Sequence, residues 1–186
     1  MEAKHYYDIG NKNVMFFLQS TIPILNMKGE LCLADDLSVI ESSNGCGEFL
    51  QSILNFKMKN KIIDEMGVKY LWVSGMENVL ERPCDPLLLG VMLNDNSDVV
   101  AKCVDAYNEA EDFYRYVSVN NRLKSFSTAF IYADAKALSE IISADQQKLR
   151  RSPITMNSVV YDTGYLNKLL SNPQLRFEIS RMYRLR

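Results

Sequence analysis

Two residue types that carry much of enzyme chemistry are scarce in this sequence. Its 186 residues contain one histidine, His5, and four cysteines, Cys32, Cys46, Cys84 and Cys103. A lone histidine has no second imidazole with which to share a metal, and the cysteines form no C-x-x-C pair, so we interpret them as reduced thiols. Zinc chemistry and histidine-dependent hydrolysis are therefore not expected.

An excess of positive charge and long apolar runs are lacking as well. The formal net charge is -2 and the pI about 5.5, so no basic field attracts DNA or RNA, and we expect no nucleic acid partner. No apolar run approaches the roughly 20 residues of a membrane helix, and the first residues, with Glu2 and Asp8, do not resemble a secretory signal. We expect no membrane association and a cytoplasmic location.

What the sequence does have is the composition of an ordinary globular protein. Hydrophobic residues make up 47% of the chain and charged residues 24%. A chain of this length has room for one well-buried core but not comfortably for two. We find no internal repeat, low-complexity tract or linker, so residues 1–186 are predicted to form a single α/β domain.

The most informative stretch is residues 68–78, an apolar run that stops at Glu77 and Asn78. Valine, leucine, tryptophan and tyrosine without clean alternation are typical of a central strand covered on both faces, as in a parallel sheet between helices. Ligands bind outside the carboxyl ends of such strands, which would place Glu77 and Asn78 beside a metal or a phosphate. The alternative is a polar turn that caps the next element.

Strand and helix patterns alternate along the rest of the chain. The strands predicted for one mostly parallel sheet are residues 14–18, 68–74, 99–104 and 126–132. Two segments separated by Asp35 and Asp36, residues 30–34 and 37–40, predict a small hairpin beside that sheet. Shorter elements are also expected: a surface excursion with one strand at 105–124, a helix after Asp134, a strand or helix start at 158–162, a helical turn at 165–170 and a strand at 175–179.

Two helices have clear boundary signals. Asp85 and Pro86 are an N-cap and a first helical residue, and they predict an apolar helix through Leu93 that presses on the sheet at Gly90. A longer helical pattern follows residues 42–48 and ends at Gly67, a residue typical of a helix C-cap.

The loop that opens this longer helix contains Gly45 and Gly47. Backbone N–H groups at a helix start have no partner within the helix, and glycines allow another molecule to approach closely. The loop therefore suits a nucleotide base or a phosphate. The alternative is a plain Asn-Gly turn in which glycine supplies a positive φ.

Four ordered blocks carry a resemblance to a known family. They are residues 16–23, residues 44–47, residues 67–78, and residues 84–86 followed by Gly90. The blocks resemble the eukaryotic UDP-sugar pyrophosphorylases, first the UDP-N-acetylhexosamine branch and second the UDP-glucose branch. In the first branch the corresponding blocks read like F-F-x-Q-G-x-x-P, D-G-N-G-G, C-V-D-N and A-D-P. Residues 156–162 and 176–179 are similar to the stretch that precedes the family's phosphate-binding lysine.

The resemblance implies a Rossmann-like, GT-A-like nucleotidyltransferase with a mostly parallel sheet and helices on both faces. It implies the joining of UTP to a sugar 1-phosphate, with release of pyrophosphate and participation of Mg²⁺. The nucleotide and sugar ligands would be bound by Gln19, Asn44, Gly45, Cys46, Gly47 and Asn78. Of these, Gln19 and Gly45 would face the uracil. Glu77 would meet Mg²⁺, and Arg186 would be the basic catalytic group.

The sequence departs from the family pattern in several places. It contains no L-x-x-G-x-G-T-R-L-G loop, so the strand and loop that cradle the triphosphate are expected to be missing. Cys46 replaces asparagine or histidine, Glu77 replaces aspartate, Phe130 replaces the asparagine that would hold the sugar, and Arg186 replaces lysine. No E-Y-S-E block is present. Residues 1–186 alone are therefore expected to be inactive.

Three functions remain open on the sequence. The chain is a truncated or divergent part of a UDP-sugar pyrophosphorylase, a noncatalytic relative acting as a binding or regulatory subunit, or an unrelated interaction module. The first two predict a pocket near Gly45 and Glu77, and the third predicts none. The partners expected for the first are a uridine nucleotide, a sugar 1-phosphate, and either a second copy of the chain or an amino-terminal complement. The replaced residues leave the sugar undetermined.

Overall fold

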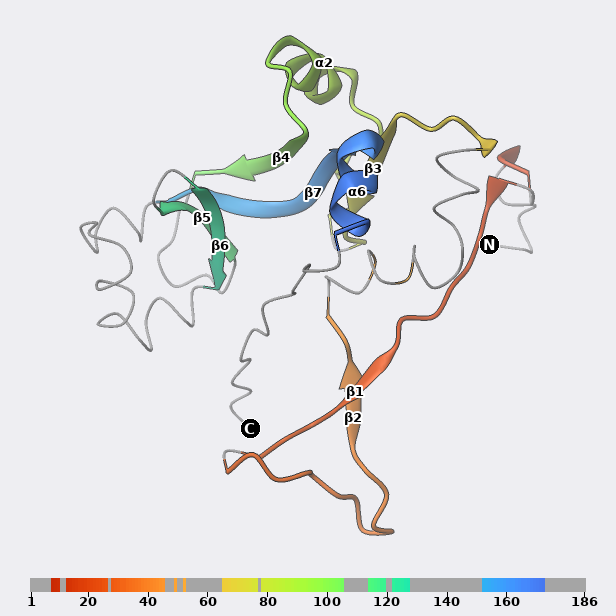
Figure 1. The fold of residues 1–186 in the computed structure, drawn as a ribbon, viewed down its shortest axis with the longest axis vertical. Coiled ribbons are helices and arrows are strands. Elements are labelled where there is room, and N and C mark those ends of the chain that lie inside the picture. The colour runs from red at the N-terminus through yellow and green to blue at the C-terminus, as the bar shows by residue number, and fades with distance from the viewer. Residues whose placement is uncertain are drawn as a thin grey trace. The chain divides into compact units, whose positions relative to one another are not determined.

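The structure is a computed structural model that describes residues 8–10, 13–26, 28–45, 49, 52, 65–76, 78–105, 114–119, 122–127 and 152–172 (Figure 1). Contacts divide the chain into two compact units. The first comprises Met1–Gly67 with Asn172–Phe177, and the second Val68–Ser171 with Glu178–Arg186. The single-domain expectation stays a prediction.

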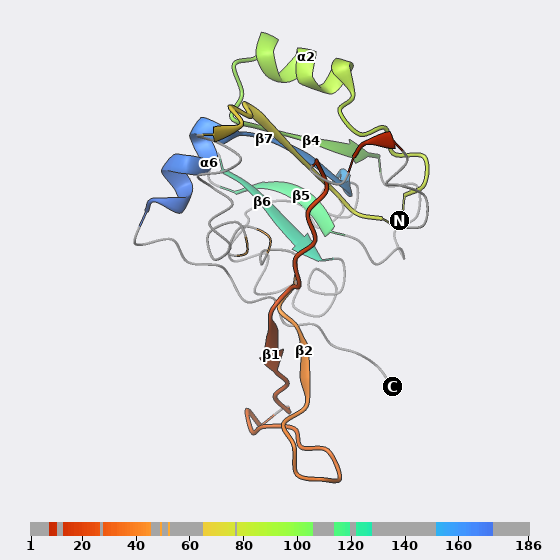
Figure 2. The ribbon, with the colours of Figure 1, turned by 90° about the vertical axis from the view of Figure 1, so that its right-hand side faces the viewer.

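The first unit contains a small antiparallel arm. Strands β1 (Thr21–Pro23) and β2 (Glu41–Ser43) lie side by side in Figure 2 and pair antiparallel. Beyond them, single bridges join Leu25 to Leu31 and Leu33 to Val39. The second bridge confirms the hairpin predicted for residues 30–34 and 37–40.

The turns of this arm have local causes. Asp36 accepts hydrogen bonds from the backbone N–H and the hydroxyl of Ser38, which closes the turn between the two hairpin segments. At the other turn, the side-chain oxygen of Asn26 accepts from the backbone N–H groups of Lys28 and Glu30. Both are Asx-type contacts, in which a short polar side chain replaces a backbone acceptor.

The strand predicted at residues 14–18 is wrong. These residues have no regular structure, and Leu18 is 87% exposed. An apolar run predicts burial in a strand only if the tertiary structure supplies a pairing partner, and the first regular strand begins later, at Thr21.

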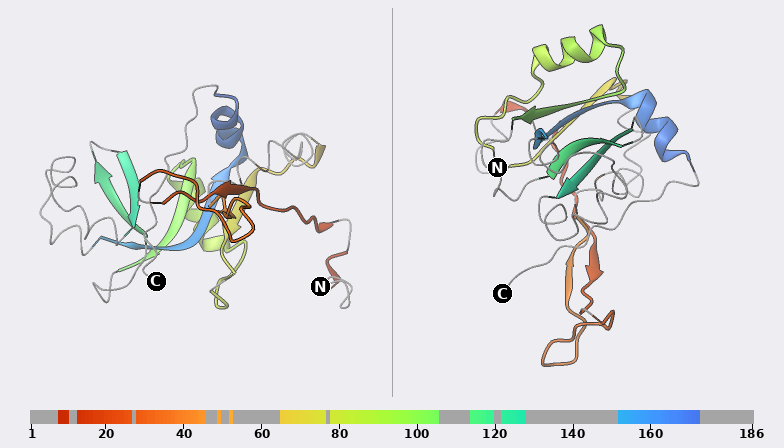
Figure 3. Two further views of the ribbon diagram at one scale, coloured as in Figure 1. Left: turned by 90° about the horizontal axis from the view of Figure 1, so that it is seen from below. Right: turned by 90° about the vertical axis from the view of Figure 1, so that its left-hand side faces the viewer.

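The described residues of the second unit form one sheet of five strands. Its elements are β3 (Tyr70–Ser74), α2 (Pro86–Asn94), β4 (Val99–Val104), β5 (Tyr114–Val119), β6 (Arg122–Ser127), β7 (Ile154–Asp162) and α6 (Thr163–Leu170). The strand order is β3-β7-β5-β6, with β4 also paired to β7. The β5–β6 hairpin, in teal, is visible in both views of Figure 3.

The predicted mostly parallel sheet is a second error, because every strand pair among the described residues is antiparallel. Residues 159–161 of β7 pair with both β3 and β4, so these two strands lie on opposite edges of β7. They run in the same direction but are not adjacent. A hydrophobic pattern indicates how deeply a strand is buried but not the direction of its neighbours. The pattern therefore could not distinguish a parallel from an antiparallel sheet.

The central strand is therefore β7 and not residues 68–78. In the described sheet β3 lies at one end of the strand order, and its residues are half-buried or exposed. Residues 158–162 were expected to be a strand or a helix start, and they form the carboxyl half of a strand of 9 residues. Asn157, with φ of 52°, lies where the register against β4 shifts, between Ala101 and Cys103.

Both helices of the second unit begin as helix-capping rules predict. Asp85 accepts from the backbone N–H of Leu87 at 3.0 Å and Pro86 is the first residue of α2, which confirms that prediction. In α6, Asp162 accepts from the backbone N–H of Tyr165 at 2.9 Å. The expected close packing at Gly90 is wrong, since a methyl group there would meet nothing within 4 Å.

The described helices of the second unit contact the sheet, α2 at β4 and α6 at β7. Alternation along β7 directs Ser158 and Val160 to one face and Val159 and Tyr161 to the other. Ser158 bonds to the segment that leads into α2. Tyr161 is half-buried beside Tyr165 of α6, and burial, together with Tyr116 and Tyr165, raises its pKa above 10.0. The most buried apolar side chains include Met92 of α2 and Leu166 of α6.

Other predictions are answered in part. Residues 105–124 were expected to hold one strand, and they contain β5 and the start of β6. Of the long helix before Gly67, Phe49 and Ser52 are described and helical, and Gly67 has φ of 63° as a C-cap glycine would. Residues 128–132, the helix after Asp134 and the last strand lie outside the described residues. No helix in the described part of the chain is long and apolar enough to cross a membrane.

Candidate functional site

Residues on either side of the β1–β2 pair come together in the first unit. The side-chain amide of Gln19 donates to the carbonyl oxygen of Gly45 at 2.5 Å. Beside it, the backbone N–H of Asn44 donates to the carbonyl of Ser20 at 3.1 Å, and its side-chain amide donates to the Ser20 hydroxyl at 3.2 Å. The strand pairing therefore unites three of the predicted site residues, Gln19, Asn44 and Gly45.

The hydrogen bond between Gln19 and Gly45 determines which polar groups remain to bind a ligand. Because the Gln19 nitrogen donates to Gly45, the orientation of the amide is set, and its oxygen and second N–H remain as an acceptor next to a donor. Gly45 has φ of 84° and open space where a side chain would stand, so its backbone is accessible. All three residues are exposed. The arrangement can bind a planar ring edge that carries a donor beside an acceptor.

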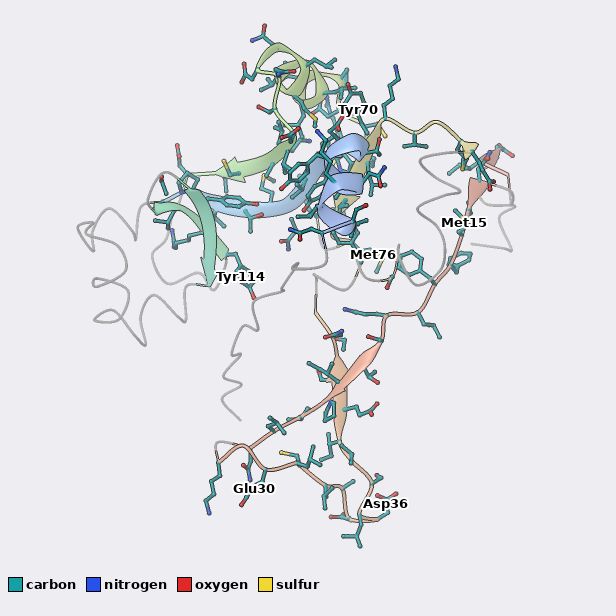
Figure 4. All side chains as sticks on the ribbon, viewed as in Figure 1. Met15, Glu30, Asp36, Tyr70, Met76 and Tyr114 are labelled. Carbon is teal, nitrogen blue, oxygen red and sulfur yellow. The ribbon has the colours of Figure 1, made fainter. Side chains whose placement is uncertain are left out.

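Of the other predicted site residues, four are outside the described residues and one belongs to the second unit. Cys46, Gly47, Glu77 and Arg186 lie outside the described residues. Asn78 belongs to the second unit, on the loop that also carries Met76, labelled in Figure 4. The gathering of Gly45 and Glu77 at one edge of a sheet stays a prediction.

Asn78 is a turn residue in this structure. Its side-chain oxygen accepts from the backbone N–H of Leu80 at 3.1 Å, and its carbonyl accepts from Glu81 at 3.1 Å. This is the alternative that the sequence left open at the end of the apolar run. The turn uses the oxygen of the side-chain amide as its acceptor.

A charged cluster that the sequence analysis missed lies behind this turn. Lys102 of β4 contacts Glu81 at 2.8 Å and Asp85 at 3.1 Å, and its nitrogen lies 5.0 Å from the ring centre of Trp72. The Ser158 hydroxyl donates to the same Glu81 oxygen at 3.0 Å. The Glu81 side chain is only 7% exposed. A lysine in the middle of an apolar strand was the available signal, because such a charge needs a partner when it is half-buried.

Electrostatics follow from these contacts. The hydrogen bond from Lys102, then that from the backbone of Leu87, lowers the pKa of Asp85 below 3.8. The hydrogen bond to Glu81 raises the pKa of Lys102 above 10.5. The pKa of each group moves in the direction that keeps it charged at neutral pH.

A metal site is not formed by the described residues alone. Over these ranges, no group of three histidine, cysteine, aspartate or glutamate side chains could hold a metal ion. Magnesium is commonly bound by one or two carboxylates together with phosphate oxygens and water. A single carboxylate such as Glu77 is therefore compatible with that donor chemistry.

Known proteins resemble this chain over most of its length. A family profile described as "UTP--glucose-1-phosphate uridylyltransferase" matches residues 2–183. A protein of Schizosaccharomyces pombe named "Probable UDP-N-acetylglucosamine pyrophosphorylase" is 28% identical over 116 residues, which cover 62% of this chain and 24% of that protein. The UDP-N-acetylglucosamine pyrophosphorylase of Saccharomyces cerevisiae is 24% identical over 135 residues, or 66% of this chain and 28% of the yeast protein.

A solved structure shares the fold. The uridine diphosphate N-acetylglucosamine pyrophosphorylase of Trypanosoma brucei, in complex with an inhibitor, superimposes with a TM-score of 0.70 at 16% identity. The match covers 91% of this chain and 33% of that one. The chain thus spans about a quarter of the two curated relatives and a third of the solved one. Because the family profile extends over nearly the whole sequence, the chain belongs to the UTP--glucose-1-phosphate uridylyltransferase family.

Proposed function

We propose that this chain is part of a UDP-sugar pyrophosphorylase of the UDP-N-acetylglucosamine type, which joins UTP to a sugar 1-phosphate and releases pyrophosphate. The observation that carries the proposal is the contact between Gln19 and Gly45, which places two residues of separate family-like blocks against each other. The names of the curated relatives support the N-acetylglucosamine branch.

Gln19 and Gly45 would recognise the uracil. Uracil presents a ring N–H between two carbonyl oxygens, whereas cytosine presents an amino group beside a ring nitrogen acceptor. The bond from Gln19 to Gly45 fixes which end of the amide accepts and which donates. An amide fixed in this way can accept from the ring N–H of uracil and donate to its neighbouring carbonyl. In cytosine these positions hold an acceptor and a donor, so both hydrogen bonds would be lost. The expected preference is therefore for uridine nucleotides over cytidine nucleotides.

The reaction depends chiefly on how the sugar phosphate and UTP are positioned. An oxygen of the sugar phosphate attacks the α-phosphorus of UTP, the new P–O bond forms, and the bond to pyrophosphate breaks in line with it. Holding two anions together and neutralising their charge is most of the catalysis. In this proposal Asn44 and Asn78 hold the nucleotide and sugar, with the segment of Cys46 and Gly47, and Arg186 neutralises phosphate charge.

Mg²⁺ is part of the proposal. When bound between phosphate oxygens it neutralises their charge. Glu77 would be its carboxylate ligand from this chain, and no geometry or reaction step is assigned to the ion.

The 186 residues alone are proposed to be catalytically incomplete. The sequence contains no glycine-rich loop of the form L-x-x-G-x-G-T-R-L-G. Removing one such donor typically lowers a rate by about a hundredfold or more, and this loop would supply several. A noncatalytic relative that keeps the binding site as a regulatory subunit is the second candidate. It is favoured by the changed residues at Cys46, Glu77 and Phe130.

Calorimetry with UTP, CTP and UDP-N-acetylglucosamine tests the binding site. We expect weak binding of the uridine ligands and weaker binding of CTP. Gln19→Ala should lower UTP affinity about tenfold, the value of one good hydrogen bond, and bring it level with CTP. Asn13→Ala, which removes an exposed amide of the same unit, should have no effect. Equal binding of UTP and CTP by the unmodified chain would remove the proposed recognition.

Pyrophosphate release tests the second part of the proposal. With UTP, N-acetylglucosamine 1-phosphate and Mg²⁺, residues 1–186 should release no pyrophosphate above a buffer control. Release that disappears in Glu77→Ala would show instead that these residues form a complete active site.

A further inference from the structure

The described residues of the loop between β3 and α2, 75, 76 and 78–85, are held to the sheet at both ends. At its start the backbone N–H of Gly75 donates to the carbonyl of Asn157 in β7 at 3.0 Å. Near its end, the buried Glu81 carboxylate is held by side chains of the sheet. Asn78 lies between these anchors, and its carbonyl accepts from the N–H of Glu81 itself. Any shift of Glu81 is therefore transmitted to Asn78 through one hydrogen bond.

The anchor at Glu81 uses two strands. One carboxylate oxygen receives the ammonium group of Lys102 from β4 at 2.8 Å and the hydroxyl of Ser158 from β7 at 3.0 Å. Lys102 also reaches Asp85 at 3.1 Å, and its nitrogen lies over the ring of Trp72. Ser158 is fully buried. The carboxylate is therefore fixed in position and in direction.

A buried ion pair of this kind is not needed for stability. Replacing such a pair by apolar side chains of similar volume is often neutral or stabilising, because the cost of desolvating two charges offsets their attraction. Apolar contacts are non-directional, however, whereas hydrogen bonds to a carboxylate fix an orientation. The charged groups of Glu81 and Lys102 can thus fix the conformation of the loop. Apolar groups at the same positions would keep the loop on the sheet without fixing its conformation.

We propose that Glu81, Lys102 and Ser158 form a positioning network that sets the orientation of Asn78 toward the nucleotide sugar. This inference rests on the proposed function, since Asn78 is assigned to the ligand by the family resemblance. The three network residues are positioning residues, which act through the turn at Asn78. Asn78 is the residue that contacts the ligand.

A triple variant separates positioning from stability. In E81L/K102M/S158A all members of the network become apolar, so the protein should unfold at nearly the wild-type temperature. Its affinity for UDP-N-acetylglucosamine, measured by calorimetry on the full chain, should fall about tenfold. In the background of Asn78→Ala, the same triple substitution should cause no further loss. Such non-additivity is the signature of residues that act through one another.

Tyr116→Phe provides the matched control. It removes a half-buried side-chain hydrogen bond of the same sheet, from Tyr116 to Thr155, without touching the loop, so ligand affinity should be unchanged. If the triple variant keeps wild-type affinity, or loses as much affinity with Asn78→Ala as without it, the network does not act through Asn78 and the inference is overturned.

Hydrogen exchange distinguishes this inference from the proposed function. The backbone N–H groups of Gly75, Leu80 and Glu81 should exchange faster in the triple variant, with exchange in β5 unchanged. If the wild type binds no UDP-N-acetylglucosamine, the proposed function fails, and unchanged exchange at these groups would then show that the network does not position the loop either. Faster exchange there would support the network with the ligand assignment withdrawn.

Discussion

Lys102 contacts three side chains of the second unit. It joins β4 to the loop residue Glu81 and to the cap residue Asp85, and it lies over Trp72. Lys102→Met keeps the length of the side chain but leaves Glu81, 7% exposed, without its cation. The free energy of unfolding should fall by roughly 2 kcal/mol, the cost of removing one partner of a largely buried charged pair. Urea denaturation measures this value.

The control for this substitution is Lys69→Met. Lys69 is exposed and precedes β3, so losing its charge should change the free energy of unfolding by no more than about 0.5 kcal/mol. Equal effects of the two substitutions would show that the contacts of Lys102 are energetically unimportant.

Asp85 makes the stability of the second unit depend on pH. Its pKa in the folded state lies below 3.8, chiefly because of the hydrogen bond from Lys102. As the pH falls, the unfolded chain therefore takes up the proton first, and the stability that Asp85 contributes is present above about pH 4 and lost as the pH falls through the folded-state pKa. Asp85→Asn should reduce the loss of stability below pH 4.

Thermal unfolding of both proteins between pH 7 and pH 2.5 checks this expectation. Asp36, whose pKa is also lowered, is present in both, so the difference between the two curves isolates Asp85. Parallel curves would mean that Asp85 has the same pKa in the folded and unfolded chains.

At the scale of elements, two helical glycines offer opposite outcomes for the same substitution. A methyl group at Gly90 in α2 would meet nothing within 4 Å, whereas one at Gly164 in α6 would lie 2.9 Å from the side-chain oxygen of Asp162. That oxygen caps α6 through Tyr165. Gly90→Ala should stabilise the protein by about 0.5–1 kcal/mol through helix propensity, and Gly164→Ala should destabilise it by up to about 1 kcal/mol through the displaced cap.

Differential scanning calorimetry of the two variants measures these shifts. Asp162→Ala should cost about the same as Gly164→Ala, and the double variant no more than either, because one cap is lost in all three. A stabilising Gly164→Ala would show that Asp162 can move without releasing the helix start.

At the scale of the whole molecule, several large apolar side chains are exposed in each unit. In the arm, Leu25, Leu31 and Leu33 are 57%, 52% and 50% exposed, and in the second unit Leu80 and Leu87 are 85% and 75% exposed. Contiguous exposed apolar side chains often mark surfaces through which proteins associate. We expect residues 1–186 to self-associate, with a sedimentation coefficient that rises with concentration. A constant monomer value from micromolar to near-millimolar concentration would contradict this expectation.

Prediction from sequence succeeded where the cause is local. The α2 start at Asp85 and Pro86, the hairpin closed by Asp36, and the helix at 165–170 each depend on a few neighbouring residues. The approach of Gln19 to Gly45 was also expected, although only through the family resemblance. The ion cluster around Lys102 was missed because Lys102 and Ser158 are far in sequence from Glu81, and no motif links the three residues.

By itself the sequence determined the caps, the turns, the positions of β3 and β4 and membership of the uridylyltransferase family. These follow from backbone conformation, short-range hydrogen bonds and ordered motifs, all of which are encoded within short stretches of the chain. Only the tertiary structure decided that β7 is the central strand and that its neighbours run antiparallel to it. Strand direction and order depend on pairing between segments up to 92 residues apart, as for Tyr70 and Asp162, and such pairing leaves no periodic mark in either segment.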